Sequence, residues 1–98
     1  MADETALVRD MARGDRARAL LESELLAEAF EALPKAYFDG WRNSPPRDTD
    51  GREKLWQAAQ IVGLVRNHLE AVMANGGLAK RELDEIARVG ERRGLFGR

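Results

Sequence analysis

The sequence contains no cysteine, which excludes disulfide bonds, thiolate catalysis and zinc sites built on cysteine. Its one histidine, His68, has no second strong ligand on its helical face, so we expect no bound metal. No apolar run approaches the roughly 18 residues that a membrane-spanning helix needs. Residues 1–4 lack the basic and apolar regions of a signal peptide, so we expect a cytoplasmic protein without membrane contact.

The chain also lacks a strong net charge, since 16 basic and 17 acidic residues give −1. No global field therefore draws it to nucleic acid or to an anionic membrane. Apolar residues make up 44% and charged residues 34% of the 98 residues, a composition typical of a thin core in a short bundle, in extended helices or in an oligomer subunit. We expect one helical domain over residues 1–90 and a flexible, basic, glycine-rich tail over 91–98.

The strongest pattern is an amphipathic segment over residues 51–75. Asp50 is the expected N-cap, with Glu53 completing a capping box, and Gly76-Gly77 is the expected C-cap. Apolar residues alternate at spacings of three and four, which is typical of a helical seam that another helix covers. We expect this seam to form the core or an interface through Leu55, Val62, Val65, Leu69 and Val72.

A second apolar stripe runs over residues 24–42 and predicts another helix, from Leu26 to Trp41. Pro34 lies inside it and favours a kink, because the stripe continues in phase beyond the proline. The short connection with Pro45-Pro46 returns the chain antiparallel. The expected fold is therefore all-α, a kinked antiparallel helical hairpin in an oligomeric bundle, with Trp41 and Trp56 facing each other at the closed end.

Short helices are expected on both sides of this hairpin. Residues 3–13 predict one, which Gly14 stops or bends, and Ser23 caps the next. The alternative is one continuous, kinked helix over this region. Residues 78–89 predict a further helix.

Candidate sites are few, and we expect no catalytic residue and no cofactor, because no nucleophile–base pair is present. His68 is interpreted as lying at the edge of the seam. Asp48, Asp50 and Glu53 could form a small metal-binding cluster, but helix capping accounts for at least two of them and is the preferred interpretation. Gly63 is either a close helix contact or merely tolerated. Leu95 and Phe96 are a candidate docking peptide in the tail.

Several basic residues near the C-terminal end are candidate phosphate contacts: Lys80, Arg81, Arg88, Arg92 and Arg93. Acidic residues are interleaved with them, which favours a solvated helix face with ion pairs three or four residues apart. DNA binding is therefore only weakly indicated.

Residues 16–83 resemble small uncharacterised helical proteins of proteobacterial phages and prophages. The likeness lies in LL-x-x-x-x-L-x-x-A-F ending at Phe30, Trp41-Arg42, D-x-x-x-R-E-x-L-W ending at Trp56, V-R-x-H-L over 65–69 and A-K-x-E-L over 79–83. The resemblance implies a phage origin and an association with head or packaging functions. It transfers no functional residue.

Together these observations predict a non-enzymatic phage-type helical protein that acts through self-association and a phage or host protein partner in virion assembly or DNA packaging. It would reside in the host cytoplasm or in the virion. Two alternatives remain: a DNA-binding packaging subunit resembling a small terminase, and a host-directed inhibitor.

Overall fold

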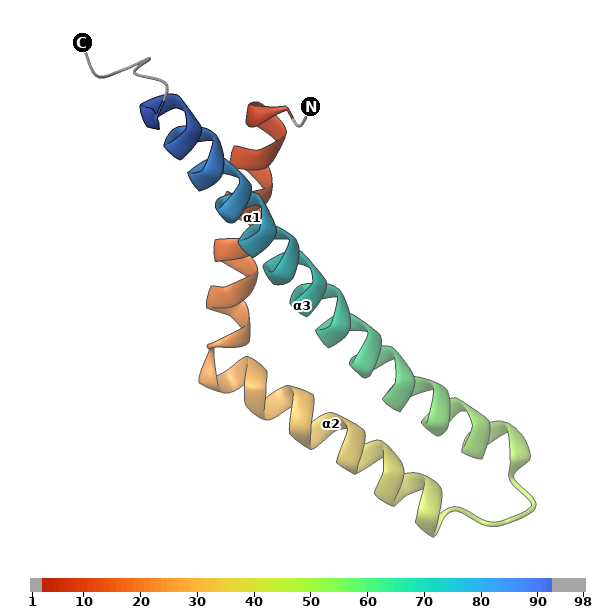
Figure 1. Cartoon of the computed structure of the whole chain (residues 1–98). Helices are drawn as coiled ribbons and strands as arrows, with labels where there is room; N and C mark the ends of the chain where they lie inside the picture. The colour runs from red at the N-terminus through yellow and green to blue at the C-terminus, as the bar shows by residue number, and fades with distance from the viewer. Residues whose placement is uncertain (1–2, 93–98) are drawn as a thin grey trace. The chain divides into compact units, whose positions relative to one another are not determined.

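The computed structural model describes residues 3–92, which form three α-helices and no strand (Figure 1). α1 spans Glu4–Leu21, α2 spans Glu24–Asn43 and α3 spans Thr49–Arg92. The all-α class expected from the helical spacing of apolar residues is therefore confirmed. In this described part, no helix combines the length and apolar character needed to cross a membrane.

Short polar side chains begin the helices. The Asp3 Oδ1 atom accepts from the Thr5 N–H at 3.0 Å, and the Ser23 Oγ atom accepts from the Leu26 N–H at 3.5 Å, as expected for the cap of α2. α3 is capped by Asp48, whose Oδ1 atom accepts from the Gly51 N–H at 3.1 Å. The expectation of Asp50 as N-cap was wrong, because the chain is already helical at Thr49 and Asp50 lies in the first turn.

Three glycines that were expected to end helices lie inside them. α1 continues through Gly14 to Leu21, which supports the continuous-helix alternative as far as Leu21, and a new helix begins at Glu24 after Ser23. α3 continues through Gly76 and Gly77 to Arg92, so the expected C-cap at Gly76-Gly77 and the separate helix over 78–89 were wrong. α2 likewise continues through Pro34, and the kink there stays a prediction.

The described residues form two compact units, and α3 contributes to both. One unit contains Leu20–Leu69, where α2 runs back alongside the first part of α3 after the connection at 44–48 (Figure 1). The other contains α1 up to Ala19 and α3 from Glu70 onward, and α1 crosses α3 within it.

The α1–α3 crossing is built on two glycines. A Cβ atom placed on Gly76 would lie 2.6 Å from the Gly14 Cα atom and 2.9 Å from the Asp10 carbonyl oxygen. The two backbones therefore touch, and only glycine fits at either position. Leu7, Ala17 and Ala79 are buried in the same unit. This contact explains the positions of Gly14 and Gly76 inside the two helices, where each glycine costs about 1 kcal/mol relative to alanine.

Candidate protein-interaction site

The closed end of the α2–α3 pair is fastened by Arg52. Its Nη1 atom donates to the Trp41 carbonyl oxygen at 3.0 Å, the Ser44 carbonyl oxygen at 3.3 Å and Ser44 Oγ at 2.9 Å. The guanidinium carbon also lies 4.4 Å from the centroid of the Trp41 ring, a cation–π distance. Ser44 Oγ in turn donates to the Trp41 carbonyl at 2.6 Å. One side chain thus satisfies the last turn of α2 and ties it to α3.

Sequence reasoning missed this role of Arg52, although one signal was available. A cation in the first turn of a helix lies at the positive end of the helix dipole, which disfavours it. An arginine at the fourth residue of α3 therefore requires partners outside that helix, and the carbonyl-rich end of α2 supplies them.

Beside this fastening lies an aromatic hollow of about 260 Å³, lined by Tyr37, Phe38, Trp41, Leu55, Trp56 and Ala59. The Phe38 and Trp41 rings are stacked, with centroids 5.8 Å apart and planes inclined by 27°. The structure places Trp41 and Trp56 in the wall of the same hollow, at the end of the pair that was expected to hold both. Phe38 and Trp56 are nevertheless more than half exposed, so the hollow is open.

The expected seam of α3 is divided by the structure. Leu55, Val62 and Leu69 are half-buried in the unit that contains α2. Val72 is half-buried in the unit that contains α1. Val65 is exposed, so the chain itself leaves this seam position uncovered.

The first half of α3 contains a stretch that is uncharged on every side. No Asp, Glu, Lys or Arg occurs between Leu55 and Val65, a stretch of three helical turns. Apart from Gln57 and Gln60 the stretch is apolar, and a helix with apolar side chains on most of its sides is normally buried. Here four of its large apolar side chains are at least half exposed: Trp56 at 59%, Ile61 at 58%, Leu64 at 64% and Val65 at 50%. In addition, none of residues 20–69, all of which the structure describes, is buried.

The basic residues toward the end of α3 are exposed. The Arg88 Nη2 atom lies 3.2 Å from Glu85 Oε2, and the Arg92 Nη2 atom lies 3.8 Å from Glu85 Oε1. These pairs support the interpretation of a solvated face for Arg88 and Arg92. Lys80 and Arg81 are exposed as well, whereas Arg93, Leu95 and Phe96 lie outside the described residues.

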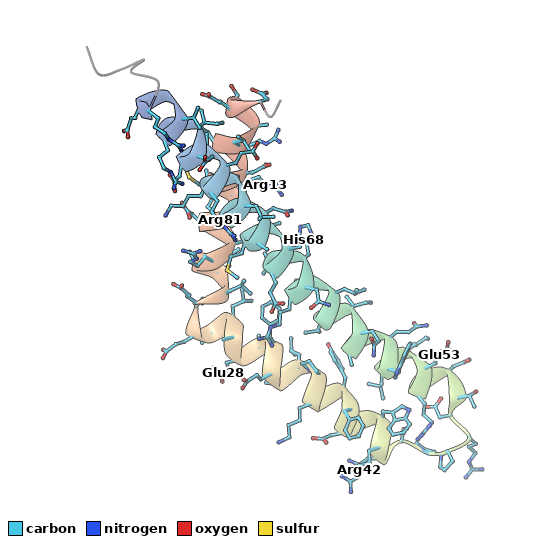
Figure 2. All side chains as sticks on the ribbon, viewed as in Figure 1. Arg13, Glu28, Arg42, Glu53, His68 and Arg81 are labelled. Carbon is cyan, nitrogen blue, oxygen red and sulfur yellow. The ribbon has the colours of Figure 1, made fainter. Side chains whose placement is uncertain are left out.

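The remaining candidate positions, His68, Glu53 and Gly63, do not form a catalytic or metal-binding group within the described residues. His68 is exposed, and it and Glu53 project from α3 in Figure 2. Within residues 3–92, no group of three or more His, Cys, Asp or Glu side chains is placed to hold a metal ion. A Cβ atom added to Gly63 would meet nothing within 4 Å, so the close helix contact lies at Gly14 and Gly76 instead.

Comparisons with known protein families, with curated proteins and with solved structures found no match. The likeness of residues 16–83 to small phage proteins therefore stays a prediction from the sequence, and the surface of the α2–α3 pair carries the functional argument.

Proposed function

We propose that this chain is a non-enzymatic helical protein that acts by self-association and by contact with other proteins. The observation that supports the proposal is the uncharged stretch between Leu55 and Val65 in the first half of α3, whose large apolar side chains Trp56, Ile61, Leu64 and Val65 are at least half exposed. Leaving this surface in water is costly, because each large apolar side chain that becomes fully buried contributes about 1.5–3 kcal/mol. Assembly covers part of this surface and makes the α2–α3 pair part of an oligomeric helical bundle.

The biological setting in this proposal comes from the sequence resemblance. The likeness of residues 16–83 to small phage proteins suggests virion assembly or DNA packaging, and self-association of identical chains is consistent with either setting. The partners are then further copies of this chain together with a phage or host protein. The alternative within this setting is DNA contact through Lys80, Arg81, Arg88 and Arg92, and the ion pairs of Arg88 and Arg92 with Glu85 count against it.

A charge placed on the exposed seam position tests the proposal. Val65→Asp is tolerated in an isolated chain because Val65 is 50% exposed, but it puts an unpaired carboxylate into an assembled interface. The expected result is a smaller mass by light scattering, or a lower melting temperature, relative to the unchanged chain.

Glu53→Asp is a matched control, since it keeps a carboxylate on an exposed position of the same helix. The proposal is wrong if Val65→Asp leaves both mass and melting temperature as they are in the control.

A further inference from the structure

α2 carries more apolar surface than α3 covers. Its inward stripe includes Leu26, Phe30, Tyr37 and Trp41, all half-buried. The charged residues of α2 all lie on the flank away from this stripe, and Figure 2 labels two of them, Glu28 and Arg42. The full set is Glu24, Glu28, Glu31, Lys35, Asp39 and Arg42. The remaining flank of α2 is apolar and uncharged.

Two aromatic residues distinguish the side of the α2–α3 pair that contains the hollow from the opposite side. Phe38 and Trp56 line the same hollow and therefore lie on one side of the pair. Each residue rotates an α-helix by about 100° around its axis. Leu33 therefore lies about 140° around α2 from Phe38, and Val65 lies about 180° around α3 from Trp56. The side opposite the hollow consequently collects one set of residues, which we call the outer apolar face: Leu25, Ala29, Leu33 and Ala36 from α2, with Ala58, Ile61 and Val65 from α3.

We propose that the outer apolar face docks on the same face of a second copy of this chain, so that two α2–α3 pairs form a four-helix bundle. This inference rests on the proposed self-association and names the surface that performs it. Leu33 at 42%, Ile61 at 58% and Val65 at 50% exposure are the large side chains at its centre.

The area of the face fits a second copy. Leu25 at 79%, Leu33 at 42%, Ile61 at 58% and Val65 at 50% exposure, together with the three alanines, expose on the order of 500 Å² per copy, so a pair buries about 1,000 Å², near the lower limit for a specific interface. Each copy contributes two adjacent helices, which is what half of a four-helix bundle supplies.

The chemistry of the face also fits a second copy. None of its seven residues is charged, and Lys54, one turn before Ala58 on the same stripe of α3, lies at its end, so the centres of two identical faces meet without like-charge repulsion. Ala29, Ala36 and Ala58 are small and allow helices of the partner to approach closely between the larger side chains.

Engineered cysteines test the face directly, because the natural chain has none. A Cβ atom on Gly40 would lie 3.5 Å from the Leu55 side chain, so these two residues are at the same level of the antiparallel pair. Seven residues farther along both helices, Leu33 is level with Val62 and therefore lies in the middle of the face, beside Ile61. In a two-fold bundle a mid-face residue meets either itself or its neighbour on the other helix. Leu33→Cys, Ile61→Cys and an equal mixture of both therefore cover the two possible directions of the partner.

The expected result is a covalent dimer in at least one of these three samples after mild oxidation. Trp56→Cys in the hollow and Glu28→Cys on the charged flank are the controls and should stay uncrosslinked. Dimers formed only by Trp56→Cys would assign the interface to the hollow and overturn the inference.

Substitution by lysine gives a second readout that does not depend on crosslinking. Ile61 and Trp56 have nearly equal exposure in the single chain, 58% and 59%, so either lysine is solvated in a free chain. Ile61→Lys should reduce the mass in solution to that of one chain with helicity retained, whereas Trp56→Lys should keep the mass of the unchanged chain.

Different results overturn docking through the outer apolar face and self-association itself. An unchanged chain that is oligomeric by mass, yet shows no crosslink at residues 33 or 61 and no dissociation by Ile61→Lys, overturns the face and leaves self-association standing. An unchanged chain that is monomeric overturns both.

Discussion

A single methyl group at Gly76 should loosen the α1–α3 crossing. The added Cβ atom would lie 2.6 Å from the Gly14 Cα atom, whereas ordinary contacts begin at 3.4 Å, so α1 must move away by close to 1 Å. A gap of this size forfeits a quarter to a half of the dispersion energy of the separated atoms, which here include buried Leu7 and Ala17. Overpacking of this kind costs about 1–3 kcal/mol.

The adjacent residue supplies a matched control for this prediction. A Cβ atom on Gly77 would meet nothing within 4 Å, so Gly77→Ala gains the helix-propensity benefit of about 1 kcal/mol without a clash. Gly76→Ala gains the same benefit and loses the packing. The two variants should therefore differ in free energy of unfolding by about 1–3 kcal/mol, with Gly77→Ala the more stable.

Two measurements check this difference. Urea unfolding followed by circular dichroism gives the free energies, and amide hydrogen exchange reports whether α1 opens locally. Exchange of the amides near Leu7 and Ala17 should be faster in Gly76→Ala by tenfold or more. Equal stabilisation by both alanines would refute the close approach of the two backbones.

The other predictions concern helix ends and the fastening arginine. Arg52→Ala should lower the free energy of unfolding by about 2 kcal/mol, because three hydrogen bonds to Trp41 and Ser44 are lost. Lys54→Ala, at an exposed neighbouring position, should change the free energy of unfolding by less than about 0.5 kcal/mol. Thermal unfolding measures both changes. Asp48→Ala should cost about 1 kcal/mol as loss of the α3 cap, and a larger cost for Asp50→Ala in urea unfolding would contradict the assignment of the cap to Asp48. Gly63→Ala should raise helicity and stability by about 1 kcal/mol, since the position is open, and a loss of stability would reveal a contact there.

Features that depend on neighbouring residues were predictable from the sequence. The helical stripe from Leu26 to Trp41 and the Ser23 cap arise from interactions within a few residues, and the structure contains both. The all-α class follows from the same local periodicity.

Features that depend on distant residues were not predictable. Gly14 and Gly76 have the local preferences of helix ends, and only their contact across the crossing explains their positions inside helices. Asp48 and Asp50 are both chemically suited to cap a helix, and the sequence alone does not decide which backbone amide lies within reach.

The candidate site was predictable in part. The apolar pattern of α3 indicates that another helix covers it, but the pattern does not say which residues α2 covers. The structure divides Leu55 and Val62, which are half-buried beside α2, from Ile61 and Val65, which are exposed. Exposure rather than periodicity therefore identifies the residues available to a partner.

The central claim is that further copies of this chain bind the exposed apolar surface of the α2–α3 pair. The absolute mass in solution tests this claim most directly. Light scattering on a sizing column, repeated over a range of protein concentrations, should give a dimer or a larger assembly whose mass falls on dilution. A ring-sized assembly of about eight or more chains would also support the claim and would favour packaging or head assembly. A single-chain mass at every concentration would contradict the claim and would favour the host-directed inhibitor.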